Sequence, residues 1–386
     1  MKKIFSEENT LIGIQAIREV IEIFSGPFLT AYFIKTSIDT LSQISIYNIF
    51  VYLILAISSV LVCYLIKRKY KIQIFRISVI INFFYILMII ILKENVINHL
   101  SILSVFYGIS TASYWVPLGL FLINKVKNER RMSYETKNQM VKTLVKILVP
   151  ILLGSMITVS NYYFTAIIIL ILSIIQITFS FILKPLEDTT QKFNIRNAWK
   201  KIKGIKNIKT TLFIEYLCGL CISNSSLTIL TTILVFNTLQ TDFKLGIITS
   251  ITSALQMLII YLYNKKISFN SKAKPTILLT SIVPILSLII LLIYKTNITI
   301  ILFYMLFTIA SGLIVVIRTV QIYNQANHAL ISVDEQCEFW AMRETCINFR
   351  KSYKFHSIIS NRSSMRITRI KYINDNINIY NCFSWS

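Results

Sequence analysis

The chain has 386 residues, of which 55% are apolar, and its mean hydropathy is +0.64. Soluble domains of this length do not repeat apolar runs of about 20 residues, the length that crosses a bilayer as a helix. The composition therefore excludes a soluble globular protein and predicts an all-α integral membrane protein. The net charge of +23 would suggest nucleic-acid binding in a soluble protein, but here membrane topology explains it and no nucleic-acid partner is expected.

About ten apolar runs follow one another along the chain. In order they cover residues 11–34, 45–66, 72–92, 98–123, 141–159, 162–183, 211–236, 245–263, 275–294 and 297–317. Lys and Arg gather in alternate loops, and the loops between those hold one lysine or none. Because positive loops stay in the cytoplasm, this alternation predicts a multi-pass bacterial cell-membrane protein with a cytoplasmic N-terminus and basic loops on the anionic inner leaflet.

The order of spans and basic loops repeats after about 200 residues, which predicts two parallel six-helix halves. The first half covers residues 1–184, and a basic cytoplasmic linker covers 185–210. Residues 211–350 form an incomplete second half, with about four helices and the start of a fifth.

Residues 351–386 read as a polar, basic tail, because three or four Arg or Lys side chains in one window make a span costly. We expect the last two helices of the second half to be missing, through a frameshift, a premature end or a degenerate copy. The alternative is a purposeful cytoplasmic tail.

Two halves with a long basic linker resemble the major facilitator superfamily over about residues 10–350. The stretch 114–119, YWVPLG, is similar to the fourth span of some members. The loop 65–71 keeps the basic residues of the family's signature but lacks its Gly and Asp. Pro150 and Gly154 match a fragment of the pattern associated with exporters. The resemblance implies alternating-access transport of a small solute, coupled to an ion, expected here to be a proton, and leaning to efflux.

Charged side chains inside a span usually face the bundle interior, and the first run holds Arg18, Glu19 and Glu22. Gln15, Arg18 and Glu22 share one helix face by their spacing. If that face lines a water-filled cavity, Glu22 could exchange a proton while Arg18 stabilises its charge or holds an anionic group. The alternative is a structural ion pair.

Gly26 and Pro27 follow within the same run, where the missing backbone bond of proline predicts a break in the helix. Such a break suits a gating helix. Pro150 and Gly154 are the corresponding kink candidates of the fifth run.

In the seventh run, Glu215, Ser223 and Asn224 stand where the repeat places the charged part of the first run. Both positions would then face one central cavity, although hydrogen bonding between helices is the alternative. Tyr114 and Trp115 could wall that cavity from the fourth run, or pack as ordinary aromatic residues.

No Gly-rich phosphate loop, paired-acid motif or metal-ligand cluster stands in the sequence. An enzyme, a cofactor and a metal are therefore not predicted. The favoured function is secondary active transport of a small solute by a monomer. The alternative is a non-transporting membrane protein, either a degenerate transporter copy or a membrane sensor.

Overall fold

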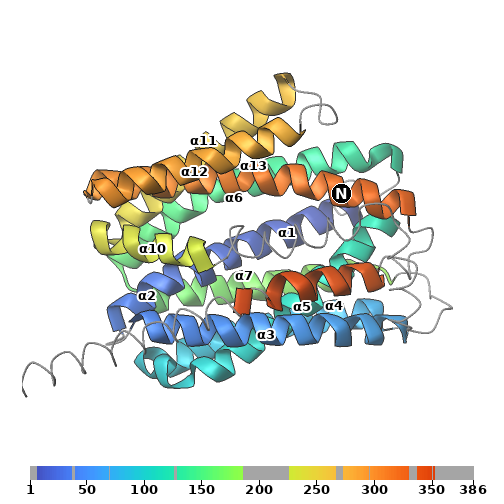
Figure 1. Ribbon diagram of the computed structural model, residues 1–386. Coiled ribbons are helices and arrows are strands. Elements are labelled where there is room, and N and C mark those ends of the chain that lie inside the picture. The colour runs from blue at the N-terminus through green and yellow to red at the C-terminus, as the bar shows by residue number, and fades with distance from the viewer. Residues whose placement is uncertain are drawn as a thin grey trace, which may run out of the picture.

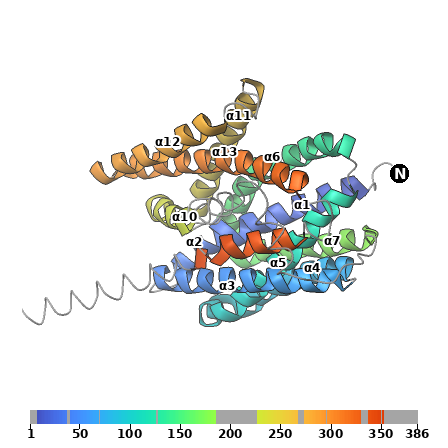
Figure 2. The same cartoon turned by 45° about the vertical axis from the view of Figure 1, so that its right-hand side comes forward.

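In the computed structural model, the chain forms a bundle of helices that run side by side (Figures 1 and 2). The structure describes residues 7–36, 40–68, 70–125, 128–185, 226–266, 273–294, 296–329, 337–349 and 351–352. No strand occurs among these residues. The all-α architecture predicted from the apolar runs is confirmed.

The first half of the chain supplies the helices up to α7. The first rod is made of α1 (Glu7–Ile23), a π-helical turn (Phe24–Phe28) and α2 (Leu29–Thr36). The following elements are α3 (Thr40–Lys67), α4 (Lys71–Leu92), a 3₁₀ turn (Lys93–His99), α5 (Leu100–Lys125), α6 (Asn128–Val159) and α7 (Tyr162–Ile182).

The second half supplies α10 (Ser226–Leu239), α11 (Asp242–Lys266), α12 (Ala273–Ile293) and α13 (Asn297–Ala329). Residues 337–349 form a further helical segment. The predicted linker and tail lie outside the described residues, apart from residues 185, 351 and 352, and the predicted seventh span is described only from residue 226.

Six stretches of the described residues are long and apolar enough to cross a membrane. They are Ser42–Lys67, Lys71–Leu122, Lys137–Val159, Tyr162–Ile182, Asp242–Leu262 and Asn297–Ile314. The second stretch contains α4 and most of α5, and two shorter apolar helices cover Ile229–Leu239 and Ile282–Ile293. Where the structure describes them, the apolar runs of the sequence therefore fall largely on helices of the bundle.

The ends of α7 illustrate how local chemistry sets helix boundaries. Asn161 precedes the helix, and its side-chain oxygen accepts a hydrogen bond of 2.8 Å from the backbone N–H of Phe164. At the other end, the Arg76 guanidinium of α4 donates to the carbonyls of Ser180 and Leu183 at 3.4 and 3.3 Å. A cation at a helix C-terminus satisfies carbonyls that have no partner within the helix.

The two halves meet closely where α6 crosses α11. A Cβ atom placed on Gly154 would lie 2.6 Å from the carbonyl oxygen of Asp242, and one placed on Gly246 would overlap the carbonyl of Pro150. Only a residue without a side chain fits at either position. Small residues let helix backbones approach in membrane proteins, and these two glycines do so across the halves.

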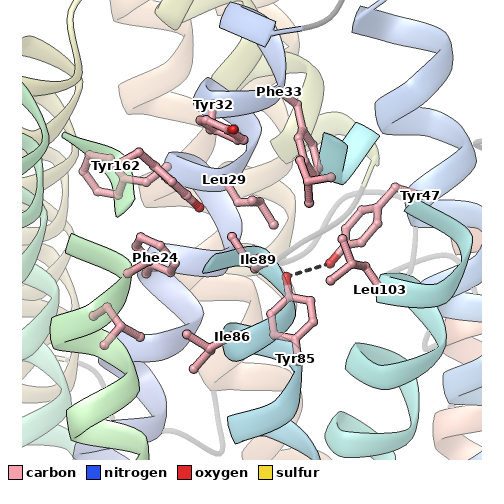
Figure 3. Packing of buried hydrophobic residues seen from close by; sticks show 14 of the residues in the cluster. Phe24, Leu29, Tyr32, Phe33, Tyr47, Tyr85, Ile86, Ile89, Leu103 and Tyr162 are labelled. Carbon is pink, nitrogen blue, oxygen red and sulfur yellow. Dashed lines mark hydrogen bonds between the residues drawn. The ribbon is translucent and has the colours of Figure 1, made fainter. Parts of the chain in front are cut away.

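The largest buried cluster surrounds the π-helical turn and is rich in aromatic rings (Figure 3). Tyr162 stacks on Phe24 and on Tyr32, with ring centroids 4.9 and 4.3 Å apart. The hydroxyls of Tyr47 and Tyr85 share a hydrogen bond of 2.9 Å, drawn as the dashed line. Aromatic and aliphatic side chains of this cluster thus pack around the irregular turn.

Candidate solute and ion pathway

Arg18 of α1 lies fully inside the first half, with 2% of its surface exposed. Its Nε donates to a carboxylate oxygen of Glu22 at 2.9 Å, one helical turn further on. Nη1 donates to the side-chain oxygen of Asn82 and Nη2 to the hydroxyl of Thr111, both at 3.0 Å. The guanidinium therefore ties α1 to α4 and α5.

Two aromatic rings complete the surroundings of this guanidinium. The Arg18 carbon Cζ lies 4.9 Å from the ring centroid of Tyr114 and 5.9 Å from that of Tyr107. A charge removed from water is tolerated only with such partners. Glu22 itself keeps 18% of its side chain exposed, whereas only 2% of the Arg18 side chain is exposed.

Two further residues of α1, Gln15 and Glu19, make polar contacts with α6. Gln15 donates to the hydroxyl of Tyr134 at 2.8 Å and accepts from the Asn138 amide at 3.1 Å. Glu19 forms an ion pair of 3.3 Å with Lys146. The polar side of α1 is thus in contact with α4, α5 and α6, and the predicted residues Gln15, Arg18, Glu19 and Glu22 all belong to it.

The break predicted at Gly26 and Pro27 falls within the π-helical turn Phe24–Phe28. Proline lacks the backbone N–H that an α-helix needs, and a π-turn accommodates the lost bond by widening the helix locally. A Cβ atom placed on Gly26 would meet no atom within 4 Å. Gly26 therefore faces open space.

That space is a cavity of about 60 Å³ beside the turn, formed between the two halves. Its walls come from the π-turn, α2, α3, α5 and α10. They consist of Ser25, Gly26, Pro27, Leu29, Thr30, Phe33, Ile44, Tyr47, Asn48, Val51, Tyr52, Tyr107, Ile229 and Thr232. Tyr107 touches both the cavity and Arg18, so the charged network and the cavity are neighbours.

The other predicted site residues are placed differently. Tyr114 packs on Arg18, whereas Trp115 is 38% exposed, with Lys142 Nζ 5.7 Å from its ring centroid. Pro150 and Gly154 lie in the contact of α6 with α11. Glu215, Ser223 and Asn224 lie outside the described residues.

Several partners of the network were not among the predicted residues, notably Asn82, Thr111, Asn138 and Lys146. One signal for Asn82 stands in the sequence, since it is an amide in the middle of an apolar run. Hydroxyl residues such as Thr111 give no such signal, because they occur in many apolar runs and often bond only their own helix.

Ion pairs join the two halves at both ends of the bundle. Lys35, at the end of α2, pairs with Asp242, at the start of α11. At the other end, Lys67 of α3 pairs with Glu338 of the segment 337–349 at 2.5 Å, and both side chains are buried. The 28 residues of α3 separate these two ends, which we name the Lys35 end and the Lys67 end.

The helical bundle and its membrane-length apolar stretches define the class of protein as a multi-pass membrane protein. The family profile of the Major Facilitator Superfamily matches residues 12–331, and the chain belongs to this superfamily of secondary transporters. It is accordingly not an enzyme. No curated protein sequence matches the chain.

Two solved transporters share the fold. One is a point mutant of the nucleoside transporter NupG, with 12% identity, a TM-score of 0.66, and 91% of each chain covered. The other is a D-xylose-proton symporter, with 10% identity, a TM-score of 0.62, and 90% of this chain and 87% of that chain covered. At these identities the likeness concerns the fold alone.

Proposed function

We propose that the chain moves a small polar solute across the bacterial cytoplasmic membrane by alternating access, as a monomer with its N-terminus in the cytoplasm. The observation that supports this most is the position of the Arg18–Glu22 pair beside a cavity lined by both halves. Glu22 precedes the cavity residues Ser25 and Gly26 by one helical turn. A site between the two halves can be reached from either side when they rock.

The cavity walls favour a solute with hydroxyl groups and a flat ring. Asn48, Thr30 and Thr232 offer hydrogen-bonding groups, and Tyr52 and Tyr107 offer ring faces. A volume of about 60 Å³ holds only a few water molecules, so such a solute enters when the halves move apart. Nucleosides and D-xylose, named for the two similar structures, begin the panel of solutes to be tested.

Coupling to protons is proposed to run through Glu22. The carboxylate of Glu22 is partly exposed, and it accepts a hydrogen bond from Arg18 Nε. Protonation would remove that charge and weaken the pair, and so link the occupancy of a proton to the position of α1. Export is the proposed direction, on the sequence pattern of Pro150 and Gly154.

Proteoliposomes with an enclosed pH dye test this proposal, with each solute added outside. The wild-type protein is expected to change the internal pH with one of the solutes. Glu22→Gln keeps the shape but cannot exchange a proton, so we expect at least a tenfold slower signal with normal membrane insertion. Glu22→Asp is the matched control and should keep part of the signal. Unchanged proton movement in Glu22→Gln would remove Glu22 from the pathway.

The second candidate is a non-transporting membrane protein, such as a sensor. It is favoured by the several hydrogen-bond partners around Arg18, which a purely structural network would also have. Counterflow of labelled solute separates the two functions. Binding of a solute without any flux, in the same proteoliposomes, would favour the sensor.

A further inference from the structure

The segment 337–349 lies antiparallel against α3, beyond the apolar runs of the second half (Figures 1 and 2). Two contacts of this segment and one of residue 352, just beyond it, mark the course. Cys337 meets Cys63, the Thr345 hydroxyl donates to the carbonyl of Ala56 at 3.2 Å, and Ser352 donates to the carbonyl of Ile49, also at 3.2 Å. The second half is therefore in contact with α3 along several helical turns.

At the Lys67 end of this contact, two free thiols face each other. The Sγ atoms of Cys63 and Cys337 are 2.8 Å apart, although the residues are 274 positions apart in sequence. Both are buried, with 0% and 1% of their surface exposed. The Lys67–Glu338 ion pair is the next contact outward.

We infer that Cys63 and Cys337 are a disulfide-forming site that, when oxidised, fastens the two halves together at the Lys67 end. A disulfide requires Cβ atoms about 3.8 Å apart and a bond of about 2.05 Å. Two sulfur atoms already in contact need only a small movement to reach that geometry. Both cysteines are on helices that pack along their length, so the pairing does not depend on a loop.

Hydrogen peroxide can serve as the oxidant for formation of this disulfide. One thiol reacts with peroxide to give a sulfenic acid and water, and the second thiol then displaces the hydroxyl group as water while the S–S bond forms. The two electrons lost by the sulfur atoms reduce the peroxide. Because both thiols are buried, peroxide reaches them only when the segment 337–349 moves away from α3.

The consequence for transport rests on the proposed function. Alternating access requires the halves to separate at each end in turn. A covalent bond between α3 and the segment 337–349 prevents opening at the Lys67 end and leaves the Lys35–Asp242 contact free to break. Oxidised protein would then remain open only toward the Lys35 end.

The first test uses the full chain with four of its six cysteines changed to serine, leaving Cys63 and Cys337. The matched control retains Cys63 and Cys346, because Cys346 belongs to the same helical segment but lies more than two helical turns further along it. Membranes are treated with hydrogen peroxide, free thiols are alkylated, and peptides are identified by mass spectrometry. A Cys63–Cys337 cross-linked peptide is expected in the first protein, and no cross-link in the control.

Alkylation of both thiols in the first protein, or equal cross-linking in the control, would overturn the inference. The wild-type chain with all its cysteines is mapped in parallel, so that a misfolded variant does not decide the result. Hydrogen exchange of residues 337–349 then tests the fastening without any transported solute. Oxidation should slow this hydrogen exchange about tenfold, and dithiothreitol should reverse the effect. Equal exchange before and after oxidation would contradict the inferred fastening. Failure of solute transport alone would affect only the proposed function.

Discussion

Arg18 holds a positive charge in the interior of the first half, and it depends on partners from three helices. Glu22 comes from its own helix, Asn82 from α4 and Thr111 from α5. Removing one member of such a set leaves the others buried without their bonds, which is more damaging than the loss of one contact. This residue is where stability and the proposed transport chemistry overlap.

Arg18→Ala is therefore expected to lower the free energy of unfolding by about 3–5 kcal/mol, because it leaves Glu22 without its cation and Asn82 and Thr111 without a donor. Unfolding of the purified protein in detergent micelles measures the change. Lys137→Ala, which alters an exposed charge on α6, is the control and should change it little. Equal stability of Arg18→Ala and the wild-type protein would show that the network contributes nothing to the fold.

The sequence predicts part of this network for a physical reason. Residues four apart on a helix share a face, so the contact of Arg18 with Glu22 follows from spacing, and the structure has that contact. Asn82 and Thr111 could not be chosen in the same way. Helix periodicity does not separate lipid-facing from interior positions when a run is apolar on all sides.

At the scale of elements, the positions of the helices along the chain were more predictable than the contacts between helices. The predicted runs 72–92 and 162–183 differ from α4 and α7 by one residue at one end each, because bilayer thickness fixes the apolar length. The close crossing of α6 and α11 was not predictable, since Gly154 and Gly246 are contacts between distant parts of the chain. The sequence singles out Gly154 only as a kink candidate beside Pro150, and it does not single out Gly246.

Gly154→Ala tests that crossing. The added Cβ would lie 2.6 Å from the carbonyl of Asp242, so α6 and α11 must shift, and we expect a loss of about 1–3 kcal/mol in stability. Thermal unfolding in detergent measures it. Gly26→Ala is the matched control, since a Cβ there meets no atom within 4 Å and should change stability little. If both substitutions behave alike, the crossing does not depend on the glycine.

At the scale of the whole molecule, the second half extends further than its apolar runs. The segment 337–349 contains Glu338, Arg343 and Glu344, and its hydropathy alone does not predict burial. In the structure Glu338 pairs with Lys67, and Arg343 with Glu344 at 2.9 Å, so opposite charges compensate one another. The start of an eleventh helix was expected from the repeat, but its charge partners come from tertiary packing.

The Lys35–Asp242 pair allows the opening of one end to be tested separately from the other. It joins α2 to α11, Asp242 is buried, and Lys35 Nζ also lies 5.6 Å from the ring centroid of Phe236 in α10. Asp242→Asn removes the charge and should favour separation of the halves at the Lys35 end, with faster labelling of a cysteine introduced at Thr232 in the cavity wall. Labelling by a membrane-impermeant maleimide, in a background without other cysteines, measures this.

A double reversal, Lys35→Asp with Asp242→Lys, provides the decisive control. It keeps the attraction with the charges exchanged, so labelling at Thr232→Cys should return toward the rate of the parent protein, whereas each single reversal should raise it. The coupling between the two positions should amount to about 0.5–3 kcal/mol, the range measured for residues in one ion pair. If the single and double reversals label equally fast, the pair does not hold this end closed. In that case, the apolar cluster that packs Ala31 of α2 against Val235 of α10 and Leu245 of α11 would be the contact that keeps the halves together there.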